Sequence, residues 1–189
     1  DPDCWKPADK SQCRDMLGLP DDKFIIGSFQ RDTEGGTRNP KLEKGPDLFC
    51  DYVEKIKDEK DIHVLLGGWR REYVIDRLQA AEIPFTFFEK VPLEKLRVMY
   101  GACDLYVVAS RFEGGPQAVL EAASMKVPII SRDVGIADAV LEPRCVVDIP
   151  NELFMPDDDS VEKNYQNVQD YSIVLHKNNY LQIFESVLK

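Results

Sequence analysis

Residues 104–132, DLYVVASRFEGGPQAVLEAASMKVPIISR, show the pattern of a strand, a glycine turn, a helix and a second strand. The apolar runs at 104–110 and 127–132 are short and rich in β-branched residues, which is typical of buried strands. The helix expected between them, 116–126, begins with a proline, whose fixed φ and missing N–H suit a first helical turn. This order indicates a right-handed βαβ unit and therefore a parallel sheet.

The same alternation of strand and helix patterns covers most of the chain. Further strands are expected at 23–30, 61–68, 84–91 and 145–149. Further helices are expected at 46–59, 69–81, 92–103 and 135–141. This order predicts an α/β fold, a Rossmann-like doubly wound parallel sheet of about six strands with helices on both faces.

The chain of 189 residues, of which 43% are hydrophobic, is long enough for one sizeable core and short for two domains. We expect a linker at 1–22, a wound core at 23–150 and a polar acidic connection from residue 151. An amphipathic helix at 174–188 is expected to end the chain, docked on the core.

The formal net charge of -10 argues against nonspecific binding to nucleic acid or to an anionic membrane. No stretch approaches the ~20 continuous apolar residues of a membrane span. The five cysteines are odd in number, widely spread and without a CxxC pair, which favours buried free thiols and a reducing, cytoplasmic compartment. The acidic runs at 1–3 and 157–159 are interpreted as solvated charge, so no metal site is expected.

Ligands of a wound sheet bind beyond the carboxyl ends of its strands, where this chain places Gly114 and Gly115 before Pro116. Exposed N–H groups and the positive end of a helix dipole bind phosphate without a side chain. The alternative is a glycine pair that only turns the chain from strand to helix.

Two acids flank that turn. Glu113 precedes it and Glu121 follows within the helix, and a carboxylate accepts two hydrogen bonds well from the vicinal diol of a sugar or ribose. The two acids are therefore candidates to bracket a diphosphate. The alternatives are that Glu113 only stabilises the helix N-terminus and that Glu121 lies on a solvated face.

Cations near the strand ends are needed to offset a diphosphate. Arg31 follows the first strand and Lys44 precedes the first helix of the core, so both are expected on the ligand side. The secondary candidates, which polar loops more often leave solvated, are Arg38, Lys41, Lys90 and Arg111. Trp69 also follows a strand, but its apolar helical stripe favours core packing.

With these residues in order, the chain resembles the C-terminal domain of family-4 glycosyltransferases, retaining enzymes of the GT-B architecture with nucleotide-sugar donors. The resemblance extends from residue 1 to about 150. Residues 44–48 resemble the lysine-glycine motif of the family, 64–68 its glycine-ended second strand and 87–92 its third-strand loop. Most specific are residues 110–128, which resemble the E-x7-E motif, a small-residue helix and the next strand.

The resemblance implies a role for each candidate. Arg31 and Lys44 would bind the diphosphate, and Glu113 would bind the transferred sugar. These three residues form the implied catalytic set. Glu121 would bind the ribose hydroxyls. Further donor contacts are implied for Gly67, Gly68, Gly114, Gly115, Pro116, Gln117, Ala118 and, through its backbone to the base, Lys90. The loop at 32–43 is longer than the family usually has, so Arg38 or Lys41 could replace either cation.

The expected function is the donor-binding half of a hexosyltransferase in polysaccharide or glycoconjugate biosynthesis. It would move a hexosyl group from a UDP- or GDP-sugar to an acceptor hydroxyl, with no metal or cofactor. In this architecture a separate N-terminal domain supplies the acceptor site and any membrane association. That domain is absent from this sequence, so the chain alone is expected to be inactive.

Three other functions would use some of the same features. A glycosidase would use Glu113 and Glu121 as acid and base, but the cationic loops and the wound sheet argue against it. A dehydrogenase would need GxGxxG after the first strand, and residues 30–36 lack it. A noncatalytic sugar-nucleotide-binding or scaffold module of the same fold stays open.

Overall fold

The structure is a computed structural model that describes residues 4–150 and 152–188. Its centre is a five-stranded sheet in the order β3-β2-β1-β4-β5, and all neighbouring strands are parallel. The strands are β1 Phe24–Phe29, β2 Ile62–Gly68, β3 Phe85–Glu89, β4 Leu105–Val108 and β5 Ile129–Ser131. Each lies within a stretch expected to be a strand, which confirms the wound α/β fold.

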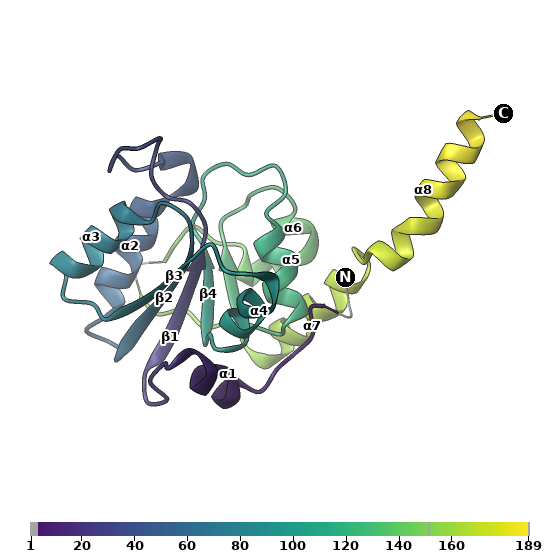
Figure 1. Ribbon diagram of the computed structural model, residues 1–189. Helices are drawn as coiled ribbons and strands as arrows, with labels where there is room; N and C mark the ends of the chain where they lie inside the picture. The colour runs from purple at the N-terminus through teal and green to yellow at the C-terminus, as the bar shows by residue number, and fades with distance from the viewer. Residues whose placement is uncertain (1–3, 151, 189) are drawn as a thin grey trace.

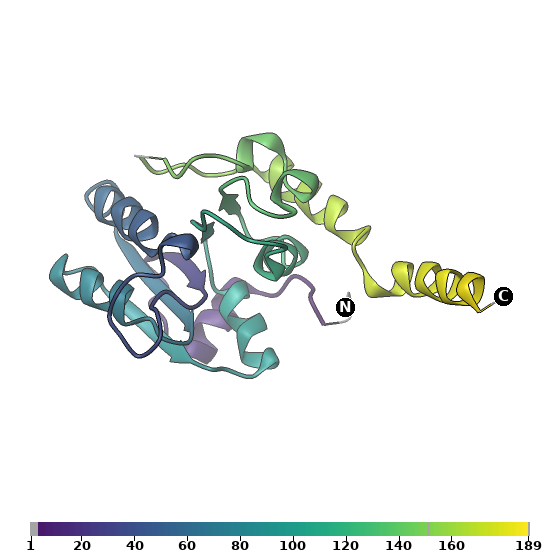
Figure 2. The same cartoon turned by 90° about the horizontal axis from the view of Figure 1, so that it is seen from above.

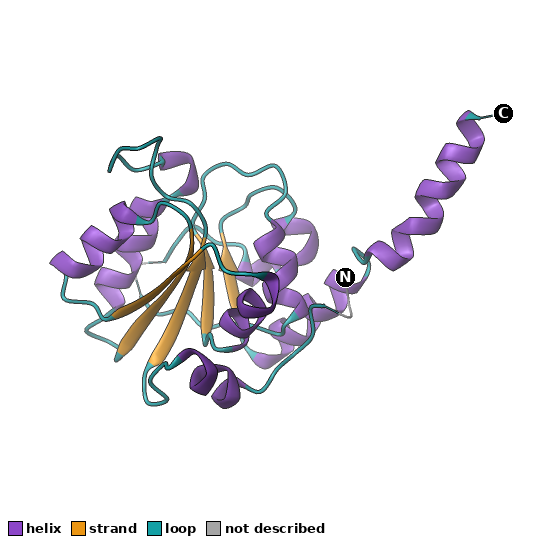
Figure 3. Cartoon of the chain, in the orientation of Figure 1, coloured by secondary structure: helices purple, strands orange, loops and turns teal. Residues whose placement is uncertain are grey.

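Helices cover both faces of this sheet (Figures 1 and 3). They are α1 Lys10–Leu17, α2 Pro46–Ile56, α3 Glu72–Ala80, α4 Leu93–Gly101, α5 Gln117–Ser124, α6 Ala137–Val140, α7 Asp158–Gln169 and α8 Ile173–Val187. Helices α2 and α3 pack on one face, and α1, α4, α5, α6 and α7 contribute to the core on the other. Neighbouring strand residues point to opposite faces, so Ile25 and Ile26 of β1 lie in different cores and are both fully buried.

The expected sixth strand at 145–149 is wrong. A short 3-10 helix, Pro143–Cys145, occupies the start of that segment. What remains makes one isolated bridge, Ser131 with Val146, and one hydrogen bond from the Val147 N–H to the Ser131 carbonyl oxygen, 2.8 Å. The segment therefore runs along the edge of β5 without enough ladder bonds to form a strand.

The two ends of the chain differ from expectation. The linker contains α1, which packs on α4, and the acidic connection contains α7, whose first N–H groups are capped by the Asp157 carboxylate. Helix α8 is not docked on the core but extends away from it (Figures 1 and 2). Its apolar side chains are exposed: Leu175, Tyr180, Leu181, Ile183, Phe184 and Val187.

All of the cysteines are free thiols, and each except Cys4 is buried, as expected. Within 4–150 and 152–188, no helix has the length and apolar character to cross a membrane. The acidic run at 1–3 lies outside the described residues.

Candidate functional site

A cavity of about 350 Å³ opens where the sheet order reverses, at the carboxyl ends of β1 and β4. Ligands of wound sheets bind at such a switch point because the two neighbouring connections leave to opposite faces there. The cavity brings together seven of the candidate residues: Arg31, Lys44, Glu113, Gly115, Pro116, Gln117 and Ala118.

Lys44 and Glu113, which are far apart in the sequence, form an ion pair in this cavity. The Lys44 Nζ lies 2.6 Å from Glu113 Oε1, and the Ser110 hydroxyl donates to the same oxygen over 3.0 Å. Both charged side chains are partly buried, so solvent screens the pair less than it would on the surface. The site therefore holds its own cation and anion against each other.

The glycine after Lys44 makes this pairing possible. Gly45 has a φ of +61°, and a Cβ there would lie 1.9 Å from the Ala109 carbonyl oxygen. Only glycine tolerates both the left-handed conformation and such close approach to the end of β4. The lysine-glycine pair thus sets Lys44 beside the loop that carries Glu113.

Arg111, a secondary cation candidate, links the loop that carries Glu113 to the segment that carries Lys44. Its guanidinium donates to both Asp47 carboxylate oxygens over 2.7 Å and to the Leu42 carbonyl over 2.8 Å. These hydrogen bonds hold the pKa of Asp47 below its usual value. Arg111 is a positioning residue here, since its donors are already engaged by protein groups.

The other candidate cations differ in whether they line the cavity. Arg31 lines the cavity, is half-buried and has no carboxylate partner among the described residues. Lys41 pairs with Glu43 over 3.1 Å and lines an adjoining open hollow of about 470 Å³ with Gly114. Arg38 instead pairs with Asp76 of α3 and does not line the cavity, so its replacement of a site cation stays a prediction.

The turn from β4 to α5 leaves backbone open to the cavity. Among the described residues, a Cβ at Gly114 or Gly115 would meet nothing within 4 Å, and Pro116, the N-cap of α5, makes no side-chain capping hydrogen bond. The first N–H groups of a helix have no intrahelical partner. Glycine backbone and helix terminus are therefore both available to an anion.

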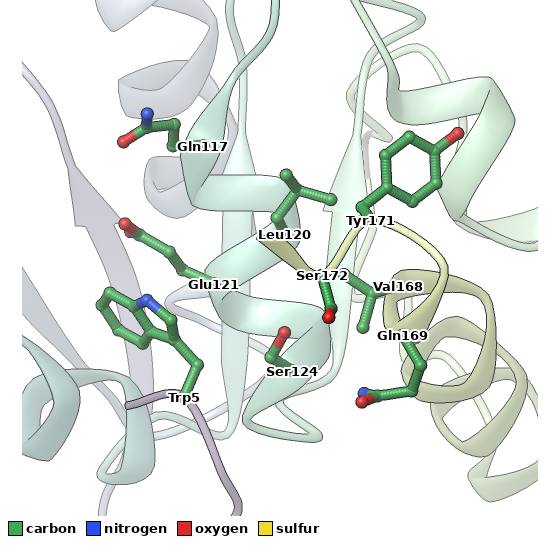
Figure 4. Close-up of a pocket in the computed structure, with 9 residues that line it drawn as sticks. All are labelled: Trp5, Gln117, Leu120, Glu121, Ser124, Val168, Gln169, Tyr171 and Ser172. Atoms are coloured by element: carbon green, nitrogen blue, oxygen red, sulfur yellow. The ribbon is translucent and has the colours of Figure 1, made fainter. Parts of the chain in front are cut away.

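Glu121 lies in a different environment, one turn into α5. Its Oε2 accepts a hydrogen bond from the Tyr100 hydroxyl of α4 over 2.9 Å, and burial raises its pKa. The alternative, that Glu121 lies on a solvated helix face, does not agree with this partial burial. It lines a second hollow of about 230 Å³, where Figure 4 shows Gln117 and Glu121 pointing to the same side, near Trp5.

Gln117 borders both the cavity and this second hollow, so the two adjoin at that residue. Glu113 lines the cavity and the adjoining hollow of about 470 Å³ but not this second hollow, and Glu121 lines the second hollow but not the cavity. Acid and base of a glycosidase must flank one bond. The separate surroundings of these two acids do not suit that chemistry.

Gly67 and Gly68 serve close packing at the end of β2. A Cβ at Gly67 would lie 2.8 Å from Met99 Cε, and one at Gly68 would lie 2.3 Å from the Gln30 carbonyl oxygen. Gly68 also has a φ of +111°, a conformation that favours glycine. These glycines bring β2 against the β1 end that carries Arg31, and neither lines the cavity.

Trp69 and Lys90 meet at the ends of β2 and β3. The Lys90 Nζ lies 4.7 Å from the centre of the Trp69 ring, and Trp69 is 38% exposed. The expected core packing of Trp69 is wrong, because α3 begins only at Glu72 and its apolar stripe does not include the indole.

A buried ion pair that the sequence did not reveal joins β1 to β2. Arg71 and Asp32 are fully buried, with 2.6 Å between Nε and Oδ2, and Arg71 also donates to the carbonyls of Ser28 and Gly67. Burial, opposed by Arg71, raises the pKa of Asp32 to about 6. This pair fixes the backbone on both sides of Arg31. No local pattern signals it, because the partners are distant in sequence.

A model of the protein family described as Glycosyl transferases group 1 matches residues 36–169. Alpha-galactosylglucosyldiacylglycerol synthase of Streptococcus pneumoniae (strain ATCC BAA-255 / R6) is 26% identical over 151 residues, which cover 73% of this chain and 37% of that protein. The chain spans about a third of the length of the curated relatives it matches.

Solved structures share the fold. Sucrose-phosphate synthase from Thermosynechococcus elongatus matches with a TM-score of 0.71 and 20% identity, over 98% of this chain and 51% of that one. HepE from Anabaena in complex with UDP-glucose matches with a TM-score of 0.65 and 17% identity, over 99% and 55%.

Proposed function

Because this chain belongs to the group 1 glycosyltransferases, we propose that it is the donor-binding domain of a transferase that uses a nucleoside diphosphate sugar. The reaction would move a hexosyl group to an acceptor hydroxyl. The observation that carries the proposal is the switch-point cavity, where Arg31, the Lys44–Glu113 pair and the uncapped start of α5 converge.

The diphosphate is assigned to Arg31, Lys44 and the first turn of α5. Arg31 has no carboxylate partner among the described residues, and the glycine turn leaves room for phosphate oxygens against the backbone. As the bond to the sugar breaks, negative charge grows on the departing diphosphate, and fixed cations and N–H groups stabilise that charge. Lys44 must exchange Glu113 for phosphate when the donor enters.

The two acids are assigned to hydroxyl groups. Once Lys44 turns to the phosphate, Glu113 can accept hydrogen bonds from the hydroxyls of the transferred sugar. Glu121, with one oxygen on Tyr100, has a second oxygen for the ribose diol. Gln117 lies where the two hollows adjoin, between the places proposed for sugar and ribose.

The chemistry is proposed to proceed with retention, with no metal and no cofactor, since cations and N–H groups supply the leaving-group stabilisation. In the described part of the chain, no three His, Cys, Asp or Glu side chains gather as a metal would need. We nominate no enzyme nucleophile. The free cysteines support a reducing compartment, for which we propose the cytoplasm.

The acceptor site is proposed to lie in a further domain of the complete transferase, so this chain alone should not turn over. The share of its relatives that the chain spans supports that proposal. UDP-glucose, which HepE holds in its solved complex, is the donor to test first.

Calorimetric titration with UDP-, GDP- and ADP-glucose tests the proposal. One donor should bind the wild-type chain. Lys44→Ala and Glu121→Ala should each lower the affinity for that donor. Arg38→Ala is the matched control, because it removes a cation that pairs with Asp76 and does not line the cavity. If no donor binds, or if all three variants bind like the wild type, the proposal fails.

A further inference from the structure

Trp69 is an exposed aromatic side chain at the carboxyl end of the sheet, beside the segment that carries Arg31. Backbone N–H groups at positions 30 and 32 donate to the carbonyls at positions 67 and 70 over 3.1 and 3.2 Å. The segments after β1 and β2 therefore stay hydrogen-bonded beyond the strand ends. Trp69 lies on the second segment alongside Arg31 on the first.

Two cations hold the indole. The Arg70 guanidinium lies 4.1 Å and the Lys90 ammonium 4.7 Å from the ring centre. In the described part of this chain, whose formal net charge is -10, neither cation forms an ion pair with a carboxylate. An acidic protein thus keeps two positive charges over one aromatic ring at the edge of its site.

The backbone at both cations is in an uncommon conformation. Arg70 has a φ of 57° and Lys90 a φ of 48°, and among the described non-glycine residues only Glu82 and Lys126 also have positive φ. Such conformations cost free energy and cluster at ligand sites, where the surrounding structure maintains them. The residues that flank Trp69 are therefore held in place rather than left to relax.

A flat indole with nearby positive charge suits a ligand that combines a planar π-system with phosphate. Aromatic side chains stack on bases of any sequence because every base has a π-face. With the diphosphate on Arg31 and Lys44 and the ribose on Glu121, whose partner Tyr100 lies on α4, the base can extend toward the start of α4, which follows Lys90. The flexible Lys90 side chain can move from the ring face when a base arrives.

We propose that Trp69 is the stacking platform for the nucleobase of the donor, with Arg70 and Lys90 as its positioning cations. This inference rests on the proposed function. It assigns base recognition to a stacking contact, so hydrogen-bonding side chains are not needed for the base to bind.

The test compares Trp69→Leu with Tyr180→Leu, which removes an exposed aromatic side chain from α8. The probes are UDP, GDP and ADP, with inorganic pyrophosphate as a competitor that lacks a base. Trp69→Leu should weaken the nucleotide that binds the wild type by about tenfold, since stacking contributes ~1–3 kcal/mol per base. Tyr180→Leu should stay within about twofold, and pyrophosphate should bind all three proteins alike.

Fluorescence supplies a second readout, because Trp5 and Trp69 are the only tryptophans of the chain. In a Trp5→Phe background, the nucleotide should quench the remaining emission and pyrophosphate should not. Normal nucleotide affinity in Trp69→Leu, with Lys44→Ala weakened, would overturn the platform and leave the donor site intact. Absence of nucleotide binding to the wild type would overturn both.

Discussion

Glu113 and Glu121 belong to one segment, yet the structure gives them opposite surroundings. Glu113 is 2.6 Å from the Lys44 ammonium and accepts a further bond from Ser110. Glu121 accepts from the neutral Tyr100 hydroxyl, and burial raises its pKa. The spacing of two acids in sequence therefore does not decide their chemistry. The chemistry of each acid is decided by the element that packs against it, which is the lysine-glycine turn for Glu113 and α4 for Glu121.

This contrast separates two effects on donor binding. In the proposed site a diphosphate would compete with Glu113 for Lys44, so Glu113 would oppose binding of the nucleotide until a sugar hydroxyl replaced the lost partner. Glu121 forms no ion pair with a described residue, so its proposed action is through hydrogen bonds alone. Variants of the two regions should therefore change the affinity for different parts of the donor.

The largest effect is expected from Lys44→Met. It removes the cation and leaves the Glu113 carboxylate to repel the diphosphate. A hydrogen bond to a charged group contributes about 1.5–3 kcal/mol, so nucleoside diphosphate affinity should fall about 10- to 100-fold. Calorimetry measures this loss, and a change below about twofold would place the diphosphate elsewhere.

Glu121→Gln should weaken the nucleotide by about five- to tenfold, because an amide replaces a charged acceptor of the ribose bonds. The effect should depend on pH. Below the raised pKa the wild-type acid takes up a proton and loses its acceptor charge, so its affinity falls with falling pH. The affinity ratio of wild type to variant cancels proton uptake by the ligand phosphate. A ratio that stays constant as the pH falls from 8 to the ordinary carboxyl pKa of 4.5 would contradict the assignment.

Glu113→Gln should act in the opposite direction on the nucleoside diphosphate. It frees Lys44 from its competitor, so we expect affinity that is unchanged or about two- to fivefold tighter. In this variant the nucleotide sugar should no longer bind more tightly than the nucleoside diphosphate. Equal weakening of both ligands would show that Glu113 does not compete for Lys44.

The smallest effect is expected from Tyr100→Phe. The lost hydroxyl donates to the carboxylate of Glu121, so its removal raises the pKa of that acid further. Nucleotide affinity at pH 8 should fall by about twofold, and the fall in affinity on acidification should begin at higher pH. An unchanged pH profile would mean that Tyr100 does not tune Glu121.

The sequence predicted the strands that hydrophobic runs and turn residues delimit locally, and it predicted that Arg31, Lys44 and Glu113 lie at strand ends. It could not predict that Lys44 and Glu113 pair, because their contact depends on the close approach of Gly45 to Ala109. The surroundings of Glu121 depend likewise on α4, which supplies Tyr100.

Errors arose where a local pattern had two physical outcomes. The apolar run at 145–149 suits either a strand or an irregular segment along the sheet edge. The 3-10 helix at its start leaves it with a single bridge to β5, so it is an edge segment. The acidic stretch at 157–159 is solvated, as expected, but the sequence did not predict that Asp157 caps a helix there. Trp69 has a core-like neighbourhood in sequence, but the end of β2 at Gly68 places it on the surface.

The most direct measurement of the central claim is a calorimetric matrix of three ligands against three proteins. The ligands are pyrophosphate, the nucleoside diphosphate that binds best and its sugar conjugate, and the proteins are wild type, Glu113→Gln and Glu121→Gln. The account predicts that Glu121→Gln loses affinity only when ribose is present and that Glu113→Gln loses it only when the sugar is present. If both variants weaken pyrophosphate alone, or if neither changes any affinity, the two acids do not divide the donor as proposed.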